Sequence, residues 1–166
     1  MKVRTYTDAA SFLSNTRVEL ESSEAANSLM LGICEQLARH PAQVDTTPCL
    51  KTVEDETGLI VVAVMTWPRK LVVYGHQGDV DGGTSTLVQA LVGERWRVPG
   101  VLGPSDVAKG VAKKWAAVTG GGFDLLRRQR VHELREVMSP TPERGSLRVA
   151  GELDVDLVAR WWYGFH

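Results

Sequence analysis

A loop rich in glycine and aspartate, in the middle of the chain, carries the residues best suited to binding chemistry. Gly82 and Gly83 have no side chains, so a phosphate can approach the backbone there, and Thr84 follows directly. A helix N-terminus binds phosphate because its first amides lack partners and the helix dipole is positive at that end. Asp79 and Asp81 lie in the same loop, and their charges would oppose a pyrophosphate by on the order of several kcal/mol. Gly82, Gly83 and Thr84 are therefore the candidate residues for binding a phosphate group, in a loop whose acidic residues oppose that binding.

Tyr74 and His76 precede this loop and are the best polar candidates for a ligand pocket. The imidazole group titrates near neutral pH, which suits it to binding and proton transfer. Neither residue has a neighbour in the sequence that defines such a role. The alternative is an aromatic residue and a solvated histidine at a strand end, and we favour that interpretation.

Other groups of reactive residues lack the context of a recognised site. Cys34, His40 and Cys49 include no CxxC-type pair and no fourth ligand, so they do not indicate zinc. His132 and Ser139 do not stand in the strand–Gly-x-Ser-x-Gly–helix context of a nucleophile elbow. We predict no metal site and no catalytic residue in this chain.

A short basic run, Arg127-Arg128-Gln129-Arg130, is the only local feature that suggests a nucleic acid. On a strand, alternate residues face opposite sides, so the run would not form one basic face. Stacking aromatic residues do not interleave with it. Pairing of these arginines with Glu133 and Glu136 is the better interpretation, and we predict no nucleic-acid partner.

Composition and charge fit an ordinary soluble domain. The 166 residues are 43% hydrophobic and 23% charged, and the formal net charge is -1. No apolar run reaches the length of a membrane span, and the N-terminus lacks the apolar core of a secretory signal. Two cysteines are too few for a disulfide framework, which favours a reducing cytoplasm. We expect a cytoplasmic protein without a membrane partner.

The elements that would position these residues follow from the hydrophobic periodicity. Residues 3–6 alternate and predict a strand, and Thr7 is the expected N-cap of a helix. Helical spacing predicts a longer helix over 22–40. Strands are then expected at 49–54, 59–67 and 70–76, joined by short polar turns that favour antiparallel hairpins. Because its core, from Leu59 to Met65, is apolar without alternation, the middle strand should have helices on both faces.

The second half of the chain alternates helices and strands. Thr84 or Ser85 is expected to cap a helix, and Pro104 should lie in the first turn of another. The remaining expected elements are a strand at 100–103, a strand at 123–134, a linker at 139–145, a strand at 147–150 and a helix ending near 166. The predicted fold class is α/β, an α+β mixed sheet, in the order β-α-α-β-β-β-α-β-α-β, then the linker and β-α.

This order resembles the GNAT superfamily of N-acetyltransferases. Local segments look like a bacterial group of predicted acetyltransferases in which two GNAT-like halves stand in tandem. The matching segments are Val3-Arg4-x-Tyr6-Thr7-Asp8, Asn27-x-Leu29-x-Leu31-Gly32-Ile33, Val98-Pro99-Gly100-Val101-Leu102-Gly103-Pro104 and Arg128-Gln129-Arg130-Val131-His132-x-Leu134. The resemblance implies an N-terminal domain over 1–138, a linker over 139–145 and the truncated start of a second domain over 146–166.

The resemblance also implies what this half lacks. Active members bind acyl-CoA through an Arg/Gln-x-x-Gly-x-Gly/Ala loop, and the Arg/Gln is not at that spacing before Gly82. The family's tyrosine acid is matched by Trp115, whose indole N–H does not donate a proton at neutral pH. We therefore expect a non-catalytic N-terminal half of an acetyl-CoA-dependent N-acetyltransferase. Acetyl-CoA is the family's cofactor, and this segment is expected to bind none.

The last predicted helix suggests partners. Trp161, Trp162 and Phe165 fall within the last six residues, and an exposed aromatic cluster drives association. The expected partner is the missing C-terminal GNAT half or a second copy of the chain. The alternative function is accordingly a cofactor-free binding or dimerisation module with a GNAT fold.

Overall fold

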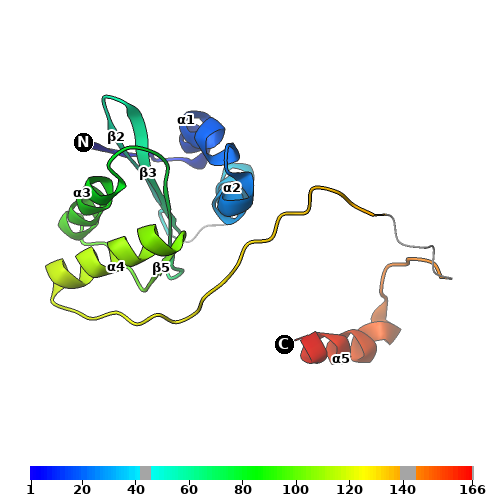
Figure 1. The fold of residues 1–166 in the computed structure, drawn as a ribbon. Coiled ribbons are helices and arrows are strands. Elements are labelled where there is room, and N and C mark those ends of the chain that lie inside the picture. Colours follow the sequence, from blue (N-terminus) through cyan, green and yellow to red (C-terminus); the bar gives the residue numbers. More distant parts are fainter. Residues whose placement is uncertain (42–45, 139–144, 166) are drawn as a thin grey trace. The chain divides into compact units, whose positions relative to one another are not determined.

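The protein divides into two compact units in a computed structural model that describes residues 1–41, 46–138 and 145–165. Among these described residues, Met1–Glu133 contains a five-stranded sheet and four α-helices, and Leu134–His166 contains one α-helix, α5 (Val155–Phe165). The fold is mixed α/β (Figure 1). Of the predicted linker at 139–145, only Gly145 lies within the described residues.

The sheet has the strand order β1-β2-β3-β4-β5. The first four strands pair as antiparallel neighbours, and β5 runs parallel to β4. The predicted hairpins are confirmed: Asp55 pairs with Gly58 across a two-residue turn, and β4 returns along β3. The strands are β1 (Lys2–Thr5), β2 (Cys49–Asp55), β3 (Gly58–Met65), β4 (Leu71–Gly75) and β5 (Val101–Leu102).

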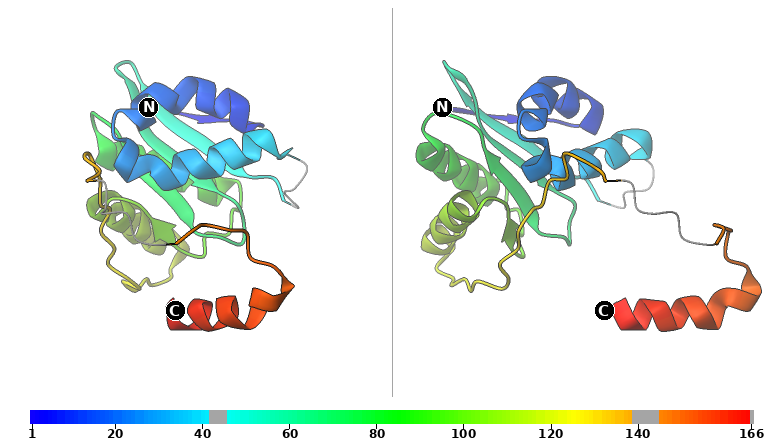
Figure 2. Two further views of the ribbon diagram at one scale, coloured as in Figure 1. Left: turned by 90° about the vertical axis from the view of Figure 1, so that its right-hand side faces the viewer. Right: turned by 45° about the vertical axis from the view of Figure 1, so that its right-hand side comes forward.

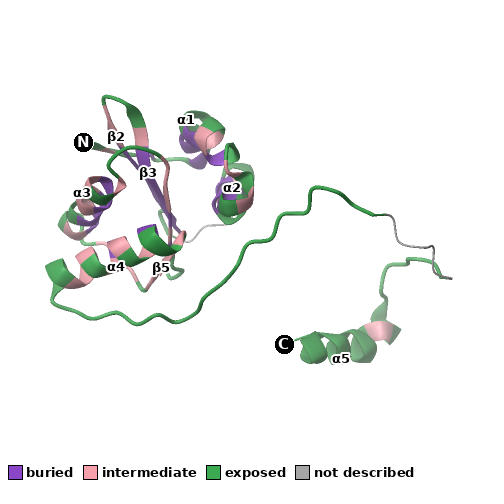
Figure 3. Ribbon diagram, in the orientation of Figure 1, coloured by how far each residue is buried: buried purple, intermediate pink, exposed green. Residues whose placement is uncertain are grey.

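Helices cover both faces of this sheet, as the apolar middle strand predicts. One pair packs on one face and the second pair on the other (Figure 2). Residues 60–65 of β3 are all buried (Figure 3), and their side chains divide between two apolar clusters, one under each helix pair. The first pair is α1 (Ala9–Glu21) and α2 (Glu24–Arg39), and the second is α3 (Val80–Gly93) and α4 (Ser105–Thr119).

Helix ends agree in part with the expected caps. The N-cap of α1 is Asp8 and not Thr7, since the Asp8 carboxylate accepts a hydrogen bond from the Ser11 amide at 2.8 Å. The backbone hydrogen bond from Ser11 is the main reason that the pKa of Asp8 lies below its ordinary value. Gly120 ends α4 in the left-handed conformation with φ of 72°.

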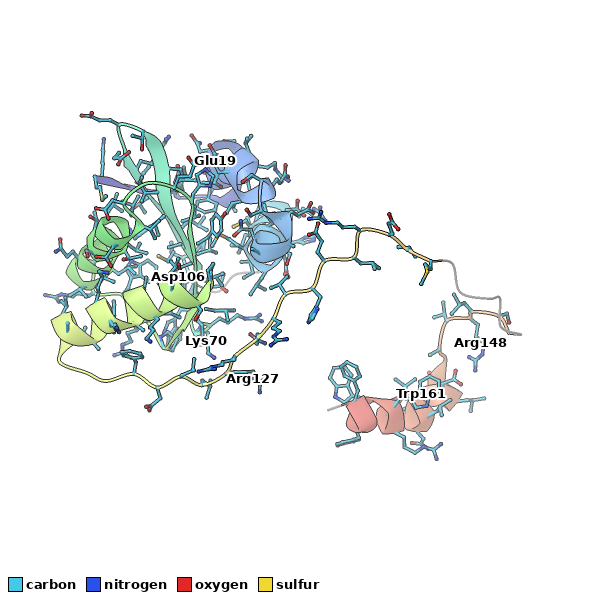
Figure 4. All side chains as sticks on the ribbon, viewed as in Figure 1. Glu19, Lys70, Asp106, Arg127, Arg148 and Trp161 are labelled. Atoms are coloured by element: carbon cyan, nitrogen blue, oxygen red, sulfur yellow. The ribbon has the colours of Figure 1, made fainter. Side chains whose placement is uncertain are left out.

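Two predicted strands do not form. Residues 123–134 and 147–150 are exposed and have neither helix nor strand conformation. Arg127, labelled in Figure 4, belongs to the first of these segments. A strand requires a partner ladder, and β-rich composition alone does not supply one. The segment expected to begin a second domain instead forms a short 3-10 turn (Glu152–Asp154) that leads into α5.

None of the helices in the described ranges combines the length and the apolar character that crossing a bilayer requires.

Candidate functional site

The predicted phosphate loop is part of a capped helix. α3 begins at Val80, so the expected cap at Thr84 or Ser85 is wrong, and the N-cap is Asp79. Its carboxylate Oδ1 accepts a hydrogen bond from the Gly82 amide at 2.9 Å, and its carbonyl accepts one from the Gly83 amide at 2.9 Å. The three residues predicted to bind cofactor therefore lie within the first five residues of α3.

This arrangement places the protein's own carboxylate where an external anion would bind. A helix N-terminus attracts anions through its amides and its dipole, and Asp79 supplies the anion internally. Asp81 adds a second negative charge and forms an ion pair with Lys114 of α4. A pyrophosphate would have to displace Asp79 and approach Asp81 at the same time.

Gly83 and Thr84 also contribute to packing at the start of α3. A Cβ on Gly83 would lie 2.8 Å from Ile60 Cγ2 and 2.9 Å from Val61 Cγ2, so only glycine lets α3 approach β3 this closely. Thr84 is buried, and its hydroxyl donates to the Asp81 carbonyl at 2.8 Å. Close packing therefore accounts for the glycine at position 83 and the buried threonine at position 84.

Tyr74 and His76 lie together but on the other side of the sheet. Their ring centroids are 6.3 Å apart with an interplanar angle of 44°, and both rings are half-buried. Tyr74 packs against the apolar cluster under α1 and α2. The next residue, Gly75, faces α3, since a Cβ there would lie 2.6 Å from Val80 Cγ1. The structure therefore separates the two candidate pocket residues from Gly82, Gly83 and Thr84.

The strands beside this loop pair over a short distance. The ladder between β4 and β5 consists of Leu71 with Val101 and Val72 with Leu102, whereas β4 continues to Gly75. The sheet edge of β4 next to the β4–α3 loop is therefore outside the β5 ladder. A Cβ on Gly103 would lie 2.2 Å from the Val73 carbonyl oxygen, and a Cβ on Gly75 would lie 3.1 Å from Val107 of α4, so neighbouring residues cover this edge of β4.

The two cysteines and Trp115 pack in the apolar clusters of the fold. Cys34 and Cys49 are buried in the two different apolar clusters, on opposite faces of the sheet, and they are free thiols. Burial raises the pKa of each thiol to about 12, so neither is a reactive thiolate at neutral pH. Trp115 packs half-buried against the cluster under α3 and α4. No group of three or more potential ligands that could hold a metal ion occurs among the described residues.

An ion pair between a buried lysine and a half-exposed glutamate lies at the far end of α3, and it was not predicted from the sequence. Lys51 of β2 has a fully buried side chain, and its Nζ donates to Glu94 Oε1 and to Thr5 Oγ1, both at 2.7 Å. Glu94 Oε2 accepts from the indole N–H of Trp96 at 2.9 Å. Burial raises the pKa of Glu94, but these hydrogen bonds outweigh it, and the pKa lies below its ordinary value. Because β2 is otherwise apolar on this face, the strand period was a signal that could have placed Lys51 inside.

No protein-family model, no curated protein and no solved structure matches this chain.

Proposed function

We propose that this chain is the non-catalytic N-terminal half of an acetyl-CoA-dependent N-acetyltransferase of the GNAT superfamily. The proposal starts from the resemblance of the local sequence segments. Three observations support it: helices on both faces of a mixed sheet, three consecutive antiparallel strands followed by a parallel β5, and a β4–β5 ladder of only two residue pairs.

The Asp79 cap is the observation that supports a non-catalytic role for this half of the enzyme. Asp79 occupies the Gly82 amide, and Asp81 maintains negative charge beside it. A diphosphate would meet carboxylates where it needs free donors, and at close range the repulsion is on the order of several kcal/mol. On this proposal the second half of the enzyme binds acetyl-CoA, and this half supports it.

Thermal unfolding with acetyl-CoA tests the proposal. A ligand present at 100 times its Kd adds about 2.7 kcal/mol of stability, which raises the melting temperature by several degrees. We expect no such rise for the wild-type chain. The Asp79→Asn variant is the matched control, because asparagine also caps helices but carries no charge.

A rise in the variant alone would identify the Asp79 charge as the block. A higher melting temperature of the wild-type chain, caused by acetyl-CoA bound at the start of α3, would contradict the proposal. The coding sequence after residue 166 provides an independent test, since an Arg/Gln-x-x-Gly-x-Gly/Ala loop is expected there.

A cofactor-free binding or dimerisation module is the second candidate, and α5 is the observation that favours it. Trp161, Trp162 and Phe165 are 67%, 64% and 85% exposed. Clustered exposed aromatic rings promote association. Light scattering should then show a dimer that the Trp161→Ala/Trp162→Ala variant loses and an Arg160→Ala control retains. A monomeric wild-type chain would exclude self-association through this helix.

A further inference from the structure

A shallow groove lies at the C-terminal end of α3, away from the loop described above. Its volume is about 380 Å³, and its lining consists of Trp67, Glu94, Arg95, Trp96 and Arg97. The helix has 14 residues, so its two ends are about 20 Å apart. The proposed function does not use this end of the helix.

The acidic member of the groove is fully engaged. Glu94 accepts from Lys51 with one carboxylate oxygen and from the Trp96 indole with the other. Lys51 is buried and is held in turn by Thr5. The chain Thr5–Lys51–Glu94–Trp96 neutralises the carboxylate and fixes the Trp96 ring. A site whose side chains are fixed by hydrogen bonds to buried residues is preorganised for binding.

The basic members of the groove are available. Arg95 and Arg97 are exposed, and within residues 1–41, 46–138 and 145–165 their guanidinium groups have no hydrogen bond or ion pair. With the Glu94 charge offset by Lys51, these two cations give the groove a positive charge. The groove therefore favours an anion, and the planar guanidinium fork matches the geometry of phosphate.

Arg95 holds its position against the local backbone preference. α3 ends in a Schellman motif, in which the Arg95 amide donates to Val92 O and the Trp96 amide to Leu91 O, both at 2.9 Å. Arg95 takes the left-handed position with φ of 60°, where glycine is the usual residue. Strained residues other than glycine concentrate at functional sites. The left-handed position therefore marks Arg95 as a candidate functional residue.

Trp67 supplies an aromatic face to the same groove. It is 44% exposed, and the Thr46 hydroxyl donates to its carbonyl at 3.3 Å. An exposed indole ring stacks with planar rings, and stacking combined with cationic side chains is a common way to bind nucleotides. We propose that this groove binds a planar ring that carries a phosphate, of the nucleoside monophosphate class, with the ring on Trp67 and the phosphate at Arg95 and Arg97.

Calorimetric titration of the full chain with AMP, adenosine and inorganic phosphate tests the proposal. We expect AMP to bind with a Kd of about 1 mM or lower, at least about tenfold more tightly than either fragment. Binding should weaken as salt is added, because the arginines are exposed. No AMP binding would overturn the proposal. Equal affinity for phosphate and AMP would also overturn it, because the ring would then contribute nothing.

Two variants separate binding from stability. Arg95→Gly should weaken AMP binding at least about fivefold and raise the melting temperature by about 2–4 °C, because glycine relieves the left-handed strain. Arg97→Ala should weaken binding with an unchanged melting temperature, and Arg127→Ala, outside the groove, should change neither. AMP affinity that survives in the Arg95→Gly/Arg97→Ala double variant would refute the assignment.

Acetyl-CoA also contains an adenine nucleotide, so its titration is repeated with Arg95→Gly. Acetyl-CoA binding that this variant loses belongs to the groove and leaves the proposed function intact. Binding that the variant retains places the cofactor elsewhere and counts against the proposed function, while the AMP result still decides the groove.

Discussion

The two ends of α3 carry opposite charges and use them differently. At the N-terminal end, Asp79 caps the helix and Asp81 pairs with Lys114, so the acidic groups are engaged within the protein. At the C-terminal end, Lys51 neutralises Glu94, whereas Arg95 and Arg97 form no ion pair with any of the described residues. Both arrangements complement the helix dipole. The difference lies in which charged groups already have partners within the protein, and not in residue type alone.

The largest expected effect tests the engaged part of the C-terminal end. Glu94→Ala leaves the buried Lys51 without its counterion, and we expect a loss of about 3 kcal/mol in the free energy of unfolding. Lys51→Met should cost less than about 1.5 kcal/mol, because the half-exposed Glu94 regains water. Urea denaturation of both variants measures the difference. Equal losses would show that the burial of the lysine charge is not the deciding factor.

The second effect tests packing at the N-terminal end with two glycines of the same helix. Gly83→Ala places a methyl group against Ile60 and Val61, and overpacking of this kind costs about 1–3 kcal/mol. Gly93→Ala meets open space and should stabilise the protein by up to about 1 kcal/mol, because alanine favours the helix. Denaturation midpoints of the two variants should move in opposite directions. A neutral Gly83→Ala variant would reopen a ligand-binding role for this glycine.

The third effect tests the cap itself. Asp79→Ala removes the carboxylate that accepts from the Gly82 amide, and loss of an N-cap costs about 1 kcal/mol. Asp81→Ala breaks only an ion pair whose aspartate is 86% exposed and should cost less than about 0.5 kcal/mol. If Asp81→Ala proved the more damaging, the ion pair to α4 would hold this end of the helix and not the cap.

The smallest effect is a pH dependence at the C-terminal end. Because the pKa of Glu94 is lower in the folded protein than its ordinary 4.5, its pairing stabilises the fold above that pH. The contribution disappears as the pH falls through the folded-state pKa. The stability difference between wild type and Glu94→Gln should therefore shrink by up to about 1 kcal/mol from about pH 6 to about pH 3. A constant difference over this range would show that charge on Glu94 is unimportant.

The sheet was predictable because its signals are local. Short polar turns specified the antiparallel hairpins, and the apolar run of β3 required two covering layers. The strands expected at 123–134 and 147–150 failed for the opposite reason: a strand depends on a partner edge, which is not encoded in the segment itself.

The sites were less predictable, because they depend on which groups meet in space. Gly82 and Gly83 suggested a phosphate loop, but the position of Asp79 as cap decides how their amides are used. The left-handed position of Arg95 was not predicted, because glycine is the usual residue at a helix end of this type. The pairing of Lys51 with Glu94 joins residues 43 positions apart and could only be found in three dimensions.

β3 is the central strand of the sheet, and this position limits aggregation through its apolar residues. Its apolar run has the composition of segments that aggregate when their backbone is open to other chains. Here β2 and β4 occupy both of its edges, and the outermost strands, β1 and β5, have only four and two residues. Short outer strands offer little template for another chain. Aggregation through β3 should therefore begin only after the sheet opens as a whole, and not after fraying of its outer strands.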